Sequence, residues 1–162
     1  IKDGTLQVIA TDHCSFDFHG DKQNGKDDFT KCPNGAPGVE TRMPIVFSEG
    51  VSKGRLSLNE FAAVTSTNPA KIFGMYPKKG VLAPGSDADI VLMNPDMEVT
   101  ITKNILHENV DYTPYEGIQV KGWPVMTMVR GQVVVENERL QVPLGFGRYI
   151  NRKPVKYMEL LK

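Results

Sequence analysis

The first residues that could do chemistry stand at positions 12–14, where a short apolar run over residues 6–10 ends in Asp12-His13-Cys14. A continuous run of this kind is typical of a strand buried on both faces of a parallel sheet or barrel. Barrel active sites are built at the carboxyl ends of such strands. Asp12 could therefore be a metal ligand, a general base or both. The alternative is a helix cap or a turn residue at a strand exit.

The three histidines do not form an evident ligand set around Asp12. Alternation along a strand points His13 away from Asp12, so we expect a packed or exposed imidazole rather than a second ligand of one metal. His19 and His107 stand in loop-like surroundings without ligand spacing. The two cysteines are too few for a disulfide framework, which favours a reducing compartment, although they could still pair with each other.

A second candidate site lies in residues 33–38, of which four are Pro or Gly. Such a backbone bends and joins a β-ladder poorly, so its amide and carbonyl groups are available to a ligand. An ordinary surface turn is the alternative. Asp87 and Asp89 could form a carboxylate pair, but their place between Pro84-Gly85 and an apolar run favours a turn in which they bond local amides.

The elements that must position these residues begin with a long loop over residues 15–41, in which Phe16, Phe18 and Phe29 suggest packing against other parts of the chain. Loops of this length without structure of their own are usually functional or disordered. Residues 43–51 then have a helical pattern, with Pro44 tolerated in the first turn.

Two further helices are predicted. Ser57 and Glu60 have the spacing of a capping box, so a helix should begin there. Its apolar face comprises Leu58, Phe61, Ala62 and Val64. A third, short helix is expected to begin at Asn68-Pro69 and to end at Gly74. Its packing residues would be Ile72 and Phe73.

From about residue 80 the pattern becomes that of a β-module. Runs of β-branched residues are separated by Gly, Pro, Asn and Asp, and they cover residues 90–93, 99–101, 125–129 and 133–135. Arg130-Gly131 predicts a tight hairpin between the last two runs, and Trp123 is expected in the core. Beyond residue 143 the chain should be extended as far as a possible short helix over residues 155–161.

Composition excludes several classes of protein. The 162 residues carry 19 basic and 19 acidic side chains, interleaved and without a basic block, which argues against a partner that is nucleic acid or a membrane surface. No stretch approaches the roughly 20 apolar residues of a membrane span. The chain begins with Ile1 and enters an apolar run almost at once. A complete protein can begin this way after processing, but we expect a portion of a larger protein. The two cysteines, too few for a disulfide framework, lead us to expect the cytoplasm.

Six stretches together resemble one family of enzymes. They are "TDHCSF", "GKDDFTKCPNGAPGVETRMP", "SLNEFAAVTSTNPAKIFGMYPKKG", "APGSDADIVLMNP", "YEGIQVKGWPVMTMVRGQVVVENE" and "GRYINRKP". Their order and content resemble the dihydropyrimidinase/hydantoinase family, cyclic-amide hydrolases of the amidohydrolase superfamily. "TDHC", "PNGAPG" and "RKP" are the specific parts of this match, and "NGAPGVETRMP" is more similar to bacterial hydantoinases than to the animal enzymes.

The resemblance implies an α/β fold, in which the last strand and helices of a (β/α)8 TIM-type barrel are followed by the carboxyl-terminal part of a β-sandwich. Residues 1–79 would then be the end of the barrel, and residues 80–142 the sandwich portion. Residues 143–162 would be an extended tail that reaches a neighbouring subunit of a homotetramer.

The resemblance also implies metal-dependent hydrolysis of a cyclic amide, with a dihydropyrimidine or 5-substituted hydantoin as the small-molecule substrate. Family members bind two divalent metal ions, commonly zinc. Asp12 matches the aspartate that ligates one ion and acts as the base for the bridging hydroxide. Asn34 matches the position whose backbone contacts the imide-like ring of the substrate.

The other metal ligands of the family, an HxH motif, a carboxylated lysine and two histidines, have no counterpart in this sequence. We therefore expect the chain to be the carboxyl-terminal third of a longer enzyme and to be inactive alone. The alternative is a non-enzymatic scaffold of the collapsin response mediator type. Those proteins lack the metal-binding aspartate and differ at the asparagine position, so the presence of Asp12 and Asn34 favours the enzyme.

Overall fold

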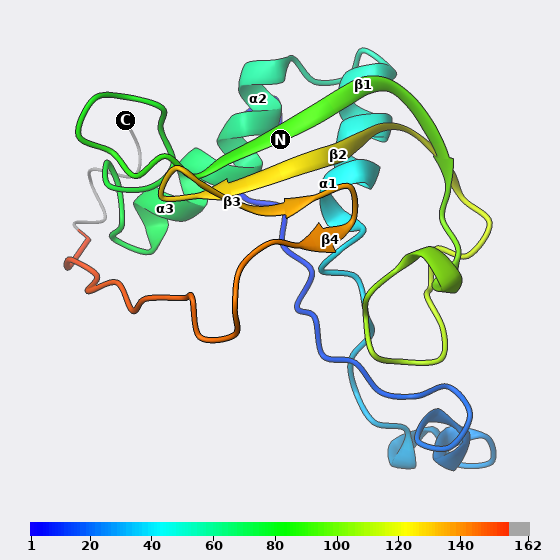
Figure 1. Cartoon of the computed structure of the whole chain (residues 1–162). Coiled ribbons are helices and arrows are strands. Elements are labelled where there is room, and N and C mark those ends of the chain that lie inside the picture. The colour runs from blue at the N-terminus through cyan, green and yellow to red at the C-terminus, as the bar shows by residue number, and fades with distance from the viewer. Residues whose placement is uncertain (156–162) are drawn as a thin grey trace.

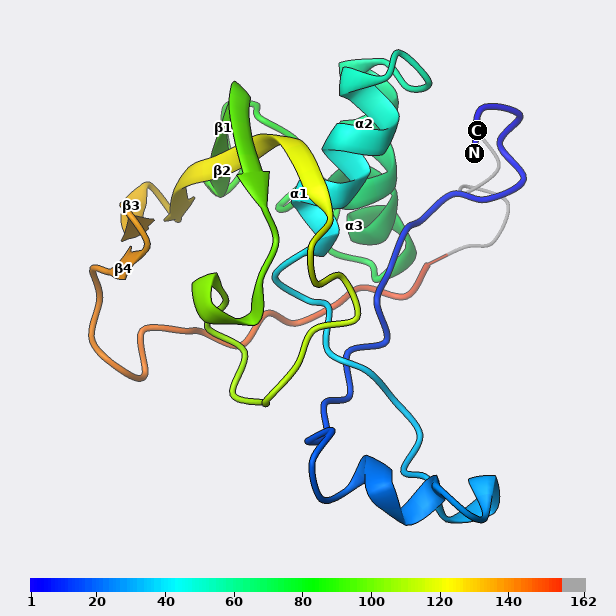
Figure 2. The ribbon, with the colours of Figure 1, turned by 90° about the vertical axis from the view of Figure 1, so that its right-hand side faces the viewer.

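The computed structural model describes residues 1–155, which form a small antiparallel sheet with helices on one of its faces (Figures 1 and 2). All four strands are consecutive neighbours, in the order β1-β2-β3-β4. They are β1 (Ile90–Thr100), β2 (Gln119–Val129), β3 (Gln132–Glu136) and β4 (Arg139–Leu140). The helices precede the sheet in the chain: α1 (Arg42–Val46), α2 (Leu58–Ala62) and α3 (Asn68–Ile72).

The helix predicted over residues 43–51 is confirmed, with an unexpected change of hydrogen bonding along it. Helix α1 continues as a π-helical segment, Phe47–Ser52, so the helical backbone covers residues 42–52. Phe47 is buried and meets Phe61 of α2 edge-on, with the two ring centroids 5.4 Å apart. This aromatic pair joins the first helical run to the second.

The capping box at the start of α2 is confirmed. The Ser57 hydroxyl accepts from the Glu60 N–H, and a Glu60 carboxylate oxygen accepts from the Ser57 N–H at 2.7 Å. Phe61 and Val64 are buried as predicted, but the apolar face is narrower than expected because Leu58 is 63% exposed and Ala62 is exposed too.

The prediction of a separate third helix was wrong. A π-helical segment, Ala63–Thr67, joins α2 to α3, and Asn68 has helical dihedral angles rather than those of a cap. The wider turn before Pro69 accommodates a ring that would otherwise break the helix. Ile72 and Phe73 were expected to anchor this helix, yet they are 40% and 51% exposed because they lie where the helix ends.

The sheet follows the predicted runs closely. Runs 90–93 and 99–101 merge into the single strand β1, and its register against β2 shifts between Asn94 and Glu98, where Pro95 cannot donate to the ladder. Arg130 and Gly131 both have positive φ, 52° and 78°, and connect β2 to β3 as a two-residue hairpin. Trp123 is buried, as predicted.

The core lies where β2 and the connection before it meet the first helical run. Its buried cluster consists of Ile101, Leu106, Val120 and Trp123. Gly122 has φ +100°, and a side-chain carbon there would overlap the ring of Phe47, so this close approach of sheet and helix requires glycine. The helices and the sheet are therefore held by direct packing.

The expected buried strand over residues 6–10 is not present, and that prediction was wrong for this chain. The segment has no ladder, Leu6 is 62% exposed, and Val8 and Ile9 are only half-buried. All strands among residues 1–155 belong to the four-stranded sheet of β1 to β4, so this segment has no strand to pair with. It runs beside the helices in Figure 2, where the Ile9 N–H donates to the carbonyl of Val64 and Arg42 donates to the carbonyl of Ile9.

The long loop over residues 15–41 is confirmed apart from two short 3₁₀ turns, Lys22–Gly25 and Phe29–Lys31. The expected packing of its aromatic residues holds only in part. Phe18 lies against His19 and Tyr112, whereas Phe29 is 85% exposed. From residue 141 to residue 155 the chain has neither helix nor strand, as predicted, and the helix expected over residues 155–161 lies almost entirely outside the described residues.

Candidate functional site

Asp12 stands in a turn with left-handed backbone conformation, at φ 48°. Asp and Asn are the side-chain-bearing residues that best tolerate this region. The residue is exposed, and among residues 1–155 its carboxylate makes no hydrogen bond or ion pair. Asp12 is therefore a free acceptor at the end of the amino-terminal segment, available to a cation or to a proton.

The loop over residues 33–38 folds back against the Asp12 turn. The Cys14 N–H donates to the carbonyl of Ala36 at 3.3 Å. Gly35 has φ +120°, and a side-chain carbon there would collide with the Cys14 carbonyl, so this approach also requires glycine. The structure thus brings the two candidate site residues, Asp12 and Asn34, onto adjacent segments.

Several polar backbone groups of this loop are already occupied. Lys22 donates to the carbonyls of Pro33 and Gly35, and the amides of Gly38 and Val39 donate to His13. Among residues 1–155, the backbone N–H and C=O of Asn34 make no hydrogen bond, and the residue is exposed. Asn34 is thus one of the positions of the loop whose backbone is available to a ligand, together with the N–H groups of Gly35 and Ala36.

His13 has the packed, non-ligand role that was expected of it. Its Nδ1 accepts from the Gly38 N–H at 3.1 Å and from the Val39 N–H at 3.3 Å. Two donors facing Nδ1 place the ring proton on Nε2. The imidazole therefore ties the turn that carries Asp12 to the loop that carries Asn34.

The other two histidines each meet a carboxylate. His19 Nδ1 lies 2.8 Å from Asp111, and His107 Nδ1 lies 2.7 Å from Glu40. The hydrogen bond to Glu40 and its negative charge raise the pKa of His107 above 6.5. Both cysteines are free thiols.

A turn precedes Asp87 and Asp89 as expected, but the prediction that their side chains bond local amides was wrong for the described residues, because their partners lie elsewhere in the chain. Both pair with Lys79, Asp87 at 2.9 Å, and Asp89 also accepts from the Arg130 N–H at 2.9 Å. Burial works against the charge of Lys79, but the hydrogen bonds to Asp89 and Asp87 raise its pKa. The ion pairs of Lys79 with these two aspartates therefore stabilise the turn before β1.

The residues that sequence reasoning missed lie between β1 and β2. Glu108 is a buried carboxylate, and Asp111 accepts the backbone N–H groups of Phe18 and His19. No spacing or composition marks these residues, because their partners lie more than 60 positions away in the chain. A cluster of acidic residues in the sequence "HENVD" was the only available signal.

The part of the chain that the structure describes does not bring together the ligands of a metal centre. Within residues 1–155 no three His, Cys, Asp or Glu side chains come together in a way that could hold a metal ion. The nearest imidazole to Asp12 in sequence, His13, has its Nδ1 occupied by two amides. The donor set present therefore does not fit a resident metal, and Asp12 would be a single ligand of a site completed elsewhere.

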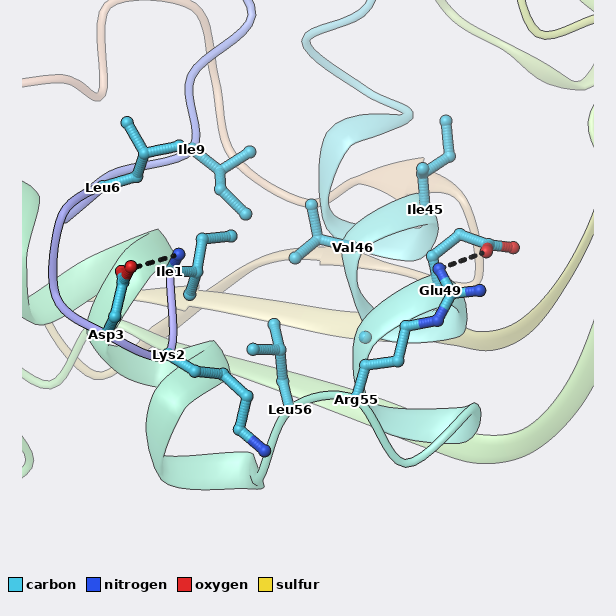
Figure 3. Close-up of a pocket in the computed structure, with 11 residues that line it drawn as sticks. Ile1, Lys2, Asp3, Leu6, Ile9, Ile45, Val46, Glu49, Arg55 and Leu56 are labelled. Carbon is cyan, nitrogen blue, oxygen red and sulfur yellow. Dashed lines mark hydrogen bonds and ion pairs between the residues drawn. The ribbon is translucent and has the colours of Figure 1, made fainter.

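An apolar groove lies away from these residues. It has a volume of about 730 Å³ and lies between the amino-terminal segment and the first helical run (Figure 3). Its walls are apolar, from Leu6, Ile9, Ile45, Val46 and Leu56, and charged side chains stand at its edge. Neither Asp12 nor Asn34 lines it. The carboxylates that line it, Asp3 and Glu49, are already in ion pairs, so Asp12 rather than this groove is the candidate for chemistry.

Comparison with known proteins identifies the class. The sequence model of the amidohydrolase family matches residues 1–134, and the chain belongs to this family. It is 47% identical to a D-hydantoinase of Geobacillus stearothermophilus over 161 residues, which is 99% of this chain and 34% of that protein. It is 46% identical to a D-phenylhydantoinase of Escherichia coli O1:K1 over 95% of this chain and 33% of that protein.

Solved structures give the same result. A dihydropyrimidinase from Brevibacillus agri NCHU1002 superposes with a TM-score of 0.93 at 51% identity, over 96% of this chain and 34% of that one. An L-hydantoinase from Arthrobacter aurescens gives a TM-score of 0.83 at 40% identity, over 93% of this chain and 33% of that one. The resemblance read from the sequence is confirmed, and the chain spans about a third of the length of these relatives.

Proposed function

We propose that this chain is the carboxyl-terminal portion of a cyclic amidohydrolase that opens the ring of a dihydropyrimidine or a 5-substituted hydantoin to an N-carbamoyl amino acid. The observation that carries the proposal is the pairing of Asp12 with the Asn34 loop on adjacent segments, in a chain similar to D-hydantoinases over nearly its whole length. The relatives named above are enzymes of this kind, which favours a hydrolase over a scaffold of the collapsin response mediator type.

In the proposed enzyme, residues 1–79 are the end of a (β/α)8 barrel, residues 80–142 are part of a β-sandwich, and residues 143–162 contact a neighbouring subunit of a homotetramer. Two features of this chain support the first assignment. The segment over residues 6–10 lacks a strand partner, and the apolar groove beside it is open to solvent (Figure 3). Preceding barrel strands would pair with the segment and cover the groove.

The reaction requires water to attack a ring carbonyl, the ring C–N bond to break and the nitrogen to gain a proton. Two divalent ions, zinc by expectation, would activate the water when bound, and Asp12 is the ligand that this chain would supply. The Asp12 carboxylate can take the proton of the attacking water and deliver it to the leaving nitrogen. The free backbone groups of Asn34 would hold the imide-like edge of the ring.

The partners proposed are the small cyclic amide and further copies of the same subunit, with no nucleic acid and no membrane. Within residues 1–155, no helix has both the length and the apolar character needed to cross a membrane. We place the proposed enzyme in the cytoplasm, because its two cysteines are free thiols.

The test compares two aspartates in a full-length enzyme that carries this sequence. Asp12→Asn should lower turnover of dihydrouracil or a hydantoin by about 10²–10⁴-fold, because the base is lost. Asp27→Asn is the matched control, since Asp27 is an exposed carboxylate on the same loop. Near-normal turnover of the Asp12 variant would remove this residue from the mechanism.

A second measurement addresses the isolated 162-residue chain. It should hydrolyse neither substrate and should hold no stoichiometric zinc, because one carboxylate cannot retain two ions. Elemental analysis that found two zinc ions per chain, together with turnover, would contradict the proposal that the site is shared with other parts of a longer protein.

A further inference from the structure

The connection between β1 and β2, residues 101–118, is a rigid loop anchored in the core. Ile101 and Leu106 are buried, and the Gly117 N–H donates to the carbonyl of Ile101 at 2.8 Å. Lys103 adds two bonds within the connection, from its backbone N–H to Glu116 at 2.8 Å and from Nζ to the carbonyl of Glu108 at 2.7 Å. Such a loop can hold other segments in place.

One end of the connection holds the beginning of the long loop. The Asp111 carboxylate accepts from the Phe18 N–H at 2.6 Å and from the His19 N–H at 2.9 Å, and it lies 2.8 Å from His19 Nδ1. In return, the Asp111 N–H donates to Asp17 at 3.2 Å. The donated amide hydrogens of His19 and Phe18 lower the pKa of Asp111, so its carboxylate is charged in this arrangement.

The other end of the connection holds the end of the same loop. The Glu40 carboxylate accepts from the His107 N–H and meets His107 Nδ1, both at 2.7 Å. Reciprocally, Glu108 Oε1 accepts from the Glu40 N–H at 3.2 Å. The Glu108 side chain is only 3% exposed, and Oε1 lies 3.8 Å from His13 Nδ1.

Glu108 is poorly satisfied where it lies. Its second oxygen, Oε2, is buried and has no hydrogen-bond partner among the described residues. His13 Nδ1 already accepts two amides, so it offers Glu108 no proton. Stability alone does not explain a buried carboxylate of this kind, because an unpaired buried acceptor is destabilising. A role in positioning its neighbours does explain it.

These contacts form a continuous path from the sheet to the proposed catalytic aspartate. Residues 107 and 108 hold residue 40, and the neighbouring amides of Gly38 and Val39 hold the His13 ring. His13 directly follows Asp12 in the chain. Asn34 lies between the two ends of the loop that the connection holds. The β1–β2 connection therefore places both candidate site residues indirectly, through the loop segments that it holds.

We propose that the β1–β2 connection is a clamp, in which Asp111 holds residues 18–19, His107 and Glu108 hold Glu40, and these two contacts position Asp12 against Asn34. The clamp residues are positioning residues, since none of them touches the reacting atoms. This inference rests on the proposed function. A displacement of about 1 Å in such a site can cost on the order of a hundredfold in rate.

The test uses a full-length, metal-loaded enzyme that carries this sequence, with dihydrouracil or a 5-monosubstituted hydantoin as substrate. The variants are Asp111→Asn and Glu40→Gln, each of which keeps the shape of the side chain while removing acceptor capacity. The matched control is Asp96→Asn, which removes an 86% exposed carboxylate from the same sheet, 3.7 Å from Lys121.

Both clamp variants should lower kcat/KM at least tenfold, with a raised KM and a lowered kcat, whereas the control should match the parent. Zinc content and Tm should stay equal to those of the control. Kinetics indistinguishable from those of the control would overturn the proposal. So would a loss of activity that follows only the fraction of folded enzyme, with KM unchanged.

Hydrogen exchange separates failure of the clamp from failure of the proposed function. The amides of Phe18 and His19 should exchange faster in Asp111→Asn than in the parent and in the control, whether or not the substrate is turned over. If the parent enzyme has no turnover, the proposed function is wrong. Hydrogen exchange at the Phe18 and His19 amides then remains as the test of the clamp. Unchanged exchange at these two amides would overturn it.

Discussion

Residues 90–136 and residues 6–10 are both rich in aliphatic and β-branched side chains, yet only the first region forms strands. In the sheet, each strand pairs with the next strand along the chain, across residues 101–118 between β1 and β2 and across tight turns between the others. The amino-terminal segment has no such neighbour among residues 1–155, and it lies on the helices with Leu6 exposed. A strand is therefore a property of a pair of segments, and an apolar run supplies only one member of that pair.

The same contrast separates folding from chemistry in this chain. Strand β2 and the β1–β2 connection contain the core cluster, while the proposed catalytic residue stands at the end of the segment that lacks a ladder. The clamp between β1 and β2 connects the two regions. Three predictions test how different the regions are, beginning with the largest expected effect.

The largest effect should come from truncating one aliphatic side chain in each region. Ile101 is fully buried, so Ile101→Ala should lower the free energy of unfolding by about 2–5 kcal/mol. Leu6 is 62% exposed, so Leu6→Ala should change it by less than about 0.5 kcal/mol in the isolated chain. Urea unfolding measures both. In a full-length enzyme, Leu6→Ala should lower the free energy of unfolding markedly. Equal losses for the Ile101 and Leu6 variants in the isolated chain would contradict the difference between the two regions.

A smaller effect should appear where the sheet meets the helices. Gly122 and Gly117 both have positive φ, +100° and +80°, but only at Gly122 would a side-chain carbon overlap the ring of Phe47. Gly122→Ala should therefore destabilise the chain by about 1–3 kcal/mol more than Gly117→Ala. Gly117→Ala is the matched control, because it carries the backbone strain alone. Equal changes in Tm for the two variants would contradict this prediction, because they would show that the Phe47 ring moves aside without loss of stability.

The smallest effect should be the pH dependence of the contact that joins the two regions. The hydrogen bond to Glu40 and its charge raise the pKa of His107, burial opposes this rise, and Glu138 adds to it. A raised folded-state pKa stabilises the fold fully below the unfolded value, near 6.5, and this stabilisation is lost as the pH rises through the folded value.

Two measurements check this expectation. NMR titration should place the pKa of His107 above 6.5 in the parent and closer to 6.5 in Glu40→Gln, with a smaller change in Glu138→Gln. The stability difference between the parent and His107→Asn should be greatest below pH 6.5 and should shrink as the solution becomes alkaline. A difference that grows with pH would contradict the assigned sign.

Local features were predictable because each depends on residues close together in the chain. The capping box needs only Ser57 and Glu60, and the hairpin needs only Arg130 and Gly131 between two β-branched runs. Errors occurred where a distant partner decides the outcome. Ile72 and Phe73 have the composition of packing residues, but they lie at a helix end where nothing among residues 1–155 buries them.

The candidate site divides in the same way. Asp12 and Asn34 were identified as positions from the sequence and its resemblance to hydantoinases. Their adjacency depends on the bond from Cys14 to Ala36 and on the two amides that hold His13. The clamp carboxylates were not predictable, because the contact between Asp111 and Phe18 spans 93 positions of the chain.

By itself, the sequence determined the family, the capping box that begins α2 and the runs that form the sheet, and it predicted Asp12 as the residue for acid–base chemistry. Only the tertiary structure decided which apolar run has a strand partner, which glycines permit close approach and which carboxylates hold the Asp12 and Asn34 segments together. The physical reason is that caps and turns satisfy their hydrogen bonds within a few residues. Strand ladders, the core and the clamp depend on contacts between segments that are far apart in the chain, and no local sequence pattern predicts those contacts.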